Sequence, residues 1–482
     1  MLMKVRTGLL DEADFATSCP DVSPHPLEMD AIWFHVNKAK EQLDKMRSCI
    51  INTLDMVIQS NNLAATSNGE GFISPGPVNE TWFSDSLVPV DLKTAFVDQV
   101  SVLEGVPDKE KDWHPGSDNQ VLDLVHPSLY CCVSGKTKRM AESGVVRGSS
   151  VVDHMHHIAF KATDVVYPRS TVCSWSNDVC QWIPSDVAVD KNGHVKFLSY
   201  INNLHPEDHA AMYDSIASIC ERFVPLFDRV LSALASESER GPQLDTSCDR
   251  DYYSENDMTN EHIPSFPDAP KRYIAEIHLT PEKPQYPGGS WHIEGSDSEN
   301  IVATGLYYFG CDNITESKLS FRVIVQEPDE VDKDTLSMAA MYGLRRDEML
   351  VQSLGAATAI EDRCLVFPNT LQHKVEPFEL ADPTKPGVRK ILAFFLVDPT
   401  KTIPSTSVIP PQQEEWLQRL VAPMLEAKGL PVAAMEEQLT HLVSDGMTLE
   451  EAKRFRRELM DARRSESNFD DNEELYFSLC EH

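Results

Sequence analysis

Apolar residues follow two different repeat patterns along the chain, and the change of pattern divides the sequence. Over residues 27–59 and again over 206–235 they recur every three or four positions, which is typical of amphipathic helices. From residue 272 to 399 short apolar runs are separated by Gly, Pro, Asn and Asp, which predicts strands joined by turns. The predicted strands are RYIAEIHL, SWHIE, IVATGLYYF, KLSFRVIVQ, RCLVF, HKVEPF and RKILAFFLV.

Helices are predicted on both sides of this strand-rich part. The pattern favours a surface helix over 328–350 and another helix over 412–427, and Thr448-x-x-Glu451 forms a capping box that opens a last helix. We therefore predict an α+β protein whose core is a β sandwich, jelly roll or barrel. The predicted units are a mainly helical N-terminal region at 1–170, a β-core at 171–400 with a helix and acidic insertion at 206–266, and a C-terminal helical extension at 401–482.

Composition narrows the range of functions. The 482 residues include 43 Lys and Arg against 76 Asp and Glu, a formal net charge of −33, which argues against nucleic-acid or anionic-membrane partners. The eleven cysteines form no CxxC motif, so a disulfide framework or zinc ribbon is not expected. The first fifteen residues, MLMKVRTGLLDEADF, include acids where a signal peptide needs a continuous apolar stretch, and we predict a cytoplasmic protein.

The strongest chemical signal lies in the stretch PGGSWHIEG, residues 287–295. His292 and Glu294 are two positions apart, and on an extended chain their side chains point to the same side. One imidazole and one carboxylate supply two ligands of a 2-His-1-carboxylate facial triad, which binds Fe(II) and leaves positions open. His373, which follows a strand-like run, is the predicted third ligand.

Arg389 opens the last apolar strand, sixteen residues after His373. Its planar guanidinium can hold a carboxylate by two hydrogen bonds. The order His-x-Glu, distant His, Gly-x-Arg resembles that of Fe(II)/2-oxoglutarate oxygenases, which have a double-stranded β-helix (jelly-roll) core. The sequence departs from that pattern in having Glu294 where most members have Asp, and in a longer gap before Arg389.

That resemblance implies a set of roles. It implies that His292, Glu294 and His373 bind Fe(II) and that Arg389 binds the distal carboxylate of 2-oxoglutarate. It also implies a dioxygenase that decarboxylates 2-oxoglutarate to succinate while hydroxylating a second substrate, which we expect to be a small molecule.

A second resemblance covers most of the chain. The segments that carry it are residues 123–130, 181–186, 196–206, 280–284, 288–295, 306–309, 321–322 and 409–412. They resemble a fungal family catalogued as a domain of unknown function, number 4246, which implies an oxygenase-type core and a fungal origin without naming a substrate.

Further residues are candidates for the pocket. Thr304, Tyr307, Tyr308 and Arg322 lie on predicted strands after the motif and are expected to line the pocket or bond the co-substrate, although aromatic residues on strands are also ordinary core. We expect Trp291 and Tyr286 to contact the substrate. Asn202 is either a further substrate contact or a residue that caps a turn through its side chain.

Two other functions fit the same residues. In an iron-dependent oxygenase that does not use 2-oxoglutarate, Arg389 would be structural. In a non-enzymatic β-core that acts as an interaction protein, no iron would bind. The helical regions would brace the β-core, cover its mouth or carry a homodimer interface.

Overall fold

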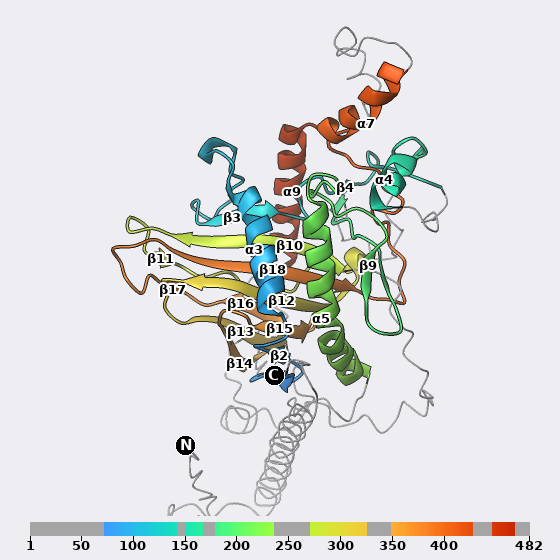
Figure 1. Ribbon diagram of the computed structural model, residues 1–482. Helices are drawn as coiled ribbons and strands as arrows, with labels where there is room; N and C mark the ends of the chain where they lie inside the picture. Colours follow the sequence, from blue (N-terminus) through green and yellow to red (C-terminus); the bar gives the residue numbers. More distant parts are fainter. Residues whose placement is uncertain are drawn as a thin grey trace, which may run out of the picture.

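A seven-stranded antiparallel sheet is the largest element of the protein, seen in a computed structural model that describes residues 72–141, 150–166, 179–235, 270–324, 349–427 and 446–467. Its strands lie in the order β1-β2-β15-β12-β18-β10-β3 (Figure 1). They are β1 (Ser74–Pro75), β2 (Trp82–Ser84), β3 (Val121–Val125), β10 (Pro270–Leu279), β12 (Ile301–Asp312), β15 (Cys364–Pro368) and β18 (Gly387–Val397).

A second antiparallel sheet faces the first. It has the order β14-β13-β16, with β13 (Ser317–Ile324) between β14 (Val351–Ala359) and β16 (Gln372–Val375). Side chains from both sheets meet in one apolar cluster, which includes Tyr308, Phe367 and Phe395 from the large sheet and Leu319 and Phe321 from the small one. We call the side of each sheet that carries this cluster its inner face. The described sheets form a sandwich and do not close into a barrel.

The outer face of the large sheet is covered by two helices, α3 (Val90–Glu104) and α5 (Ala210–Ala235), which lie side by side across it (Figure 1). Phe96 of α3 and Phe223 of α5 are fully buried against Phe309 and Phe394 of the sheet. A Cβ atom at Gly305 would lie 2.7 Å from the Phe223 ring, so this glycine permits the close approach of α5 to β12.

Shorter elements complete the structure. Two-stranded pairs join β4 to β7, β5 to β6, β8 to β9 and β11 to β17. These strands are β4 (Cys132–Val133), β5 (Lys138–Arg139), β6 (Asp164–Val165), β7 (Cys180–Gln181), β8 (Val187–Val189), β9 (Val195–Phe197), β11 (Gln285–Tyr286) and β17 (Phe378–Glu379). The remaining helices are α4 (Val151–Ala159), α7 (Glu414–Ala427), α9 (Leu449–Ser467) and the 3₁₀ turns η1 (Asp108–Glu110) and η3 (Asp297–Glu299).

The α+β prediction is confirmed, and six of the seven predicted strands form as β10, β12, β13, β15, β16 and β18. The seventh, SWHIE, is wrong, because only an isolated bridge between His292 and His373 forms there. Helices α5 and α7 match the predictions, and Thr448 and Glu451 make the reciprocal capping bonds at the start of α9.

The predicted N-terminal unit contributes to the β-core itself. Strands β1, β2 and β3, all before residue 170, belong to the large sheet, alongside the helices α3 and α4 of the same region. The helix predicted over 27–59 lies outside the described residues, as does the one predicted over 328–350 except for its last two positions, which are not helical. Within the described part of the chain, no helix is long and apolar enough to cross a membrane.

Candidate metal centre

The structure brings His292, Glu294 and His373 together. One ligand atom from each residue can be chosen so that all three lie within 4.8 Å of one another. Nε2 of His373 lies 3.2 Å from Oε1 of Glu294, and Nε2 of His292 lies 3.8 Å from the same oxygen. The backbones of His292 and His373 exchange two hydrogen bonds of 3.1 and 2.9 Å, which hold the segment before β12 against β16.

Each histidine ring is fixed by a hydrogen bond on the side away from Glu294. Nδ1 of His292 lies 2.8 Å from the carbonyl oxygen of Ser290, and Nδ1 of His373 lies 3.4 Å from that of Leu371. A carbonyl oxygen only accepts, so each Nδ1 carries a hydrogen, and in a neutral ring the Nε2 lone pair is free. Both Nε2 atoms therefore face the carboxylate, and a metal ion or a proton between the three groups would satisfy them.

Burial and charge shift the pKa values of all three groups. Burial alone would raise the pKa of Glu294, but hydrogen bonds and attraction from both histidines hold it well below its usual range. Burial opposes protonation of His292, yet the hydrogen bond and charge of Glu294 raise its pKa. Burial and the neighbouring His292 lower the pKa of His373. Glu294 is therefore ionised at neutral pH, and its charge is available to a cation, either a proton on His292 or a metal ion.

Exposure differs across the three ligands. The His373 side chain is 4% exposed and that of Glu294 14%, whereas His292 is 39% exposed. A metal ion held here would be enclosed by Glu294 and β16 on one side and reached from solvent beside His292. Phe367 packs edge-on against the His373 ring at 4.8 Å between centroids and limits its movement.

Asn369 is a further residue of the site that the sequence reasoning missed. Its Oδ1 accepts from the backbone N–H of Glu294 at 2.9 Å, and its Nδ2 donates to the carbonyl oxygens of Glu294 and Ile301 at 2.9 and 3.1 Å. Asn369 lies in the turn between β15 and β16, four residues before His373. It therefore joins the segments that carry two of the ligands, a contact that no local sequence pattern signals.

We expect Asn369→Ala to weaken metal binding about tenfold, because residues that orient metal ligands typically contribute ten- to a hundredfold to affinity. The measurement is Co(II) titration followed by absorbance. Asn300→Ala is the control, since among the described residues the Asn300 amide bonds only the nearby Ser298 carbonyl oxygen. Equal affinity in Asn369→Ala and the unmodified protein would contradict the role.

Arg389 lies on the inner face of β18. It is an even number of positions from Ala393 and Phe395, which belong to the inner apolar cluster, and side chains two apart on a strand point to the same face. The side chain is buried, its Nη1 donates to Ser317 Oγ at 2.7 Å, and its Nε has no partner among the described residues. Its guanidinium lies over the rings of Tyr308 and Phe378, at 5.7 and 5.5 Å. No carboxylate of the described residues pairs with this buried charge, which is costly unless a ligand supplies one.

The residues predicted on β12 separate to its two faces. Thr304 lies on the inner face with Leu306 and Tyr308; it is fully buried, and its Oγ1 has no partner among the described residues. The prediction for Tyr307 is corrected. Its side chain points to the outer face of the sheet, into the apolar cluster beneath α3 and α5, with its hydroxyl 3.5 Å from Asp362. The structure therefore does not bring Tyr307 to the metal ligands.

Arg322 and Trp291 also require correction. Arg322 pairs in register with Gln372, and Phe321 pairs with His373, so Arg322 and His373 occupy opposite faces of the small sheet. Arg322 donates to Gln372 at 2.7 Å and lies over the Trp291 ring at 4.7 Å, while Lys374 lies 4.9 Å from that ring. These cation–π contacts anchor the motif from outside the sandwich.

Tyr286 and Asn202 occupy two other places. Tyr286 stacks near Phe378, close to Arg389, and lines an open cleft of about 940 Å³. Asn202 is a correction, because its amide donates to the carbonyl oxygen of Tyr130 at 3.0 Å and accepts from Gln413 at 3.1 Å. These bonds join segments distant in sequence, so Asn202 links the segments of Tyr130 and Gln413 and does not cap its own turn.

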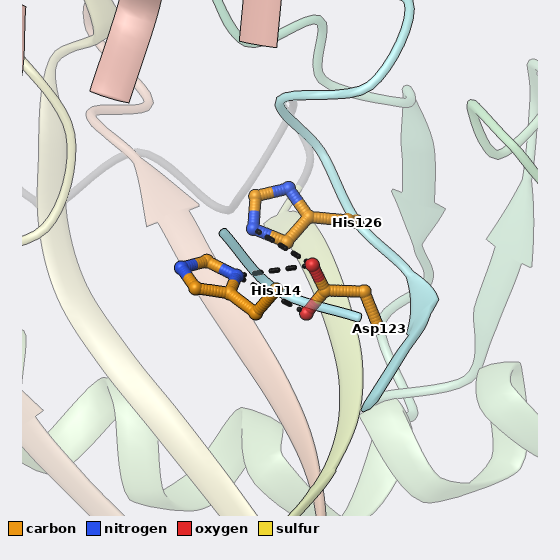
Figure 2. Close-up of side chains that lie close together, drawn as sticks. All are labelled: His114, Asp123 and His126. Atoms are coloured by element: carbon orange, nitrogen blue, oxygen red, sulfur yellow. Dashed lines mark hydrogen bonds and ion pairs between the residues drawn. The ribbon is translucent and has the colours of Figure 1, made fainter. Parts of the chain in front are cut away.

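A second group of potential ligands, absent from the sequence predictions, lies at the edge of the large sheet. Figure 2 shows the Asp123 carboxylate between the rings of His114 and His126. Nδ1 of His114 lies 3.0 Å and Nε2 of His126 lies 3.9 Å from Asp123 Oδ2, and Tyr273 donates to Oδ1 at 2.8 Å. Burial would raise the pKa of Asp123, but the two histidines and Tyr273 lower it.

Its hydrogen bonds make this second group a poor metal site. The backbone N–H of Ser128 donates to His126 Nδ1 at 3.0 Å, so the hydrogen of the neutral ring is on Nε2, which faces Asp123. The guanidinium of Arg456 also lies 3.5 Å from Asp123 and supplies the positive charge. The group is therefore a hydrogen-bonded network that ties β3 to α9.

The second group predicts a pH dependence of stability. Burial lowers the pKa of His126 to about 4, against an ordinary value of 6.5. The neutral ring contributes to the free energy of unfolding above pH 6.5. This contribution is lost as the pH falls, because the unfolded chain then binds a proton that the folded chain does not. The loss reaches about 3 kcal/mol by pH 4.

We expect His126→Asn, whose Oδ1 can still accept from Ser128, to lose less stability between pH 6.5 and pH 4 than the unmodified protein. Urea unfolding of both proteins between pH 7 and 4 measures it, and parallel curves would contradict the assignment.

Comparison with known proteins assigns the chain to a family. The family described as "Protein of unknown function (DUF4246)" matches residues 51–269 and 273–420. The chain belongs to DUF4246. The predicted family is thereby confirmed, and the matched part of this DUF4246 member contains all three proposed ligands and Arg389. The predicted fungal origin stays a prediction.

Solved structures with some likeness to this DUF4246 member include several oxygenases. The Fe(II)/(alpha)ketoglutarate-dependent dioxygenase TqaL is 11% identical, with a TM-score of 0.23. The match covers 65% of this chain and 92% of the TqaL chain. The dioxygenase for auxin oxidation in rice is 13% identical, with coverage of 71% and 79% and a TM-score of 0.26. TM-scores of this size do not establish a shared fold. No curated protein matches the sequence.

Proposed function

We propose that the protein is an Fe(II)- and 2-oxoglutarate-dependent oxygenase, with a jelly-roll core, that acts on a small-molecule substrate. The observation that carries the proposal is the orientation of His292 and His373, whose Nε2 atoms converge on the Glu294 carboxylate while their Nδ1 atoms bond carbonyl oxygens. Two imidazoles and one carboxylate are the donor set of mononuclear non-haem Fe(II) sites with open positions.

Arg389 supports the choice of 2-oxoglutarate. Its guanidinium is buried on the inner face, and it lacks a carboxylate partner among the described residues. A dicarboxylate would supply that partner through its distal group, with charge-assisted hydrogen bonds to the planar fork. The unpaired Thr304 hydroxyl on the same face of β12 is a further hydrogen-bond donor for the bound anion.

Each residue of the proposed site would have a distinct role. Fe(II) with 2-oxoglutarate would supply the oxidising chemistry, with O₂ as the oxidant that gives one oxygen atom to succinate and one to the substrate. His292, Glu294 and His373 would fix the position of the metal, and Asn369 would fix the backbone of Glu294. Arg389 would orient the co-substrate, and Phe367 and Tyr308 would exclude water from the space between the sheets.

The test is an anaerobic titration of metal-free protein with Fe(II) and then with 2-oxoglutarate, followed by visible absorbance. We expect a metal-to-ligand charge-transfer band that needs both additions. Tight Fe(II) binding without the band would favour the iron-dependent oxygenase that does not use 2-oxoglutarate. If Fe(II) does not bind, the enzyme proposal fails and the interaction protein becomes the better explanation.

A further inference from the structure

Helix α9 contacts the segment that follows the proposed ligand Glu294, although it begins well beyond residue 420, where the family match ends. Two arginines seven residues apart lie on one side of it. Arg456 donates to both oxygens of Asp112, at 2.6 and 2.9 Å, and Arg463 donates to both oxygens of Glu299, at 2.7 and 2.6 Å. Phe455 and Leu459 of the same helix join the inner apolar cluster.

Glu299 is fully buried, and its carboxylate accepts hydrogen bonds from the turn that follows Glu294. Its Oε2 accepts from the backbone N–H of Ser296 at 3.0 Å, and its Oε1 accepts from the backbone N–H of Trp182. The Arg463 guanidinium lies 3.8 Å from the centroid of the Trp182 ring, and that ring stacks on Phe395. Arg463 is thus held by a carboxylate and an aromatic face together.

The carboxylate of Glu299 also touches the residue next to the proposed ligand. Gly295 has φ +76°, and a Cβ atom there would lie 2.6 Å from Glu299 Oε2. The backbone from Glu294 to Ser296 is therefore shaped around this carboxylate on one side. On the other side Asn369 holds the backbone N–H and carbonyl group of Glu294.

We propose that α9, through Arg463 and Glu299, positions Glu294 for metal binding. The inference rests on the proposed metal site, and neither residue is itself a ligand. Without Arg463, the buried Glu299 carboxylate loses the cation that donates to both of its oxygens, and removing one partner of a buried ion pair is strongly unfavourable. Glu299 then moves toward solvent or takes up a proton, the turn around Gly295 loosens, and the Glu294 carboxylate leaves the point where the two Nε2 atoms meet.

The experiment compares variants of the full chain by Co(II) affinity, measured calorimetrically, and by the melting temperature of the metal-free protein. Arg463→Met is expected to raise the Co(II) dissociation constant about tenfold, and Arg463→Lys is expected to restore most of the affinity. Arg454→Met, an exposed position on the same helix, is expected to leave it unchanged. Glu299→Gln serves as a second variant should Arg463→Met fold poorly, and it is expected to weaken Co(II) binding similarly.

Two further variants separate the possible failures. Arg456→Met removes the other anchor of α9; a loss of affinity equal to that of Arg463→Met would assign the effect to helix docking and overturn the specific role. Glu294→Gln tests the metal site itself. If Glu294→Gln loses Co(II) while Arg463→Met and Glu299→Gln bind it like the unmodified protein, the positioning role is overturned and the metal site stands. If Glu294→Gln binds Co(II) normally, the proposed site fails and the positioning role falls with it.

Discussion

His373→Ala is expected to weaken Fe(II) binding more than about a hundredfold, because it removes a ligand, whereas loss of a residue that only orients a ligand costs ten- to a hundredfold. His373 is the most buried of the three proposed ligands, and its Nε2 lies 3.2 Å from Glu294. The two groups that remain, His292 and Glu294, are neighbours in one segment and would hold a metal ion from one side only.

Anaerobic calorimetry with Fe(II) measures the effect, and Co(II) absorbance provides an oxygen-stable check. His194→Ala is the matched control, because that ring is mostly exposed and its neighbouring acids, Glu221 and Asp190, are not proposed ligands. The control should bind Fe(II) like the unmodified protein. An unchanged Fe(II) dissociation constant in His373→Ala would rule out the three-residue centre.

Arg389→Met is expected to raise the dissociation constant of 2-oxoglutarate in the Fe(II)-loaded protein roughly thirtyfold or more. Truncating one partner of a buried, hydrogen-bonded charge pair costs about 2–5 kcal/mol, and 1.4 kcal/mol corresponds to a factor of ten. The affinity for Fe(II) itself should change little, since Arg389 is not a proposed ligand.

The stability of the metal-free protein provides an independent readout for Arg389. The guanidinium is buried with one hydroxyl partner and no carboxylate among the described residues, and replacing such a charge by an apolar side chain is often neutral or stabilising. We therefore expect the melting temperature of metal-free Arg389→Met to stay the same or rise. A structural arginine would give the opposite result, a lower melting temperature with unchanged 2-oxoglutarate binding.

Arg419→Met is the control for this experiment. Arg419 makes two hydrogen bonds to Asp208 at the surface, so its loss removes an arginine without touching the space between the sheets. Its effect on 2-oxoglutarate affinity should be negligible, and its effect on stability should not exceed the modest contribution of an exposed ion pair, about 1 kcal/mol or less.

The proposed roles of His373 and Arg389 fail in different ways. If His373→Ala abolishes Fe(II) binding while Arg389→Met leaves 2-oxoglutarate binding intact, the protein is a metal protein with another co-substrate. If both variants behave like the unmodified protein, the sandwich is a scaffold whose histidines and arginine serve packing.

The sequence by itself determined the features that depend on local order. Strands with strong apolar runs, such as β12 and β18, form from their own residues. The spacing of His292 and Glu294 directed both side chains to one point even though the expected strand there is only a bridge. The choice of His373 and Arg389 came from their order along the chain and the resemblance it carries.

The tertiary structure decided which face of each strand is the inner one, because alternation separates neighbouring residues without saying which side is covered by helices. Tyr307 and Tyr308 are adjacent, yet only Tyr308 lies between the sheets, since α3 and α5 cover the other face. Asn369, Glu299 and Arg463 became visible only in the fold. Their hydrogen bonds join segments distant in sequence, and such contacts leave no periodic signal in the chain.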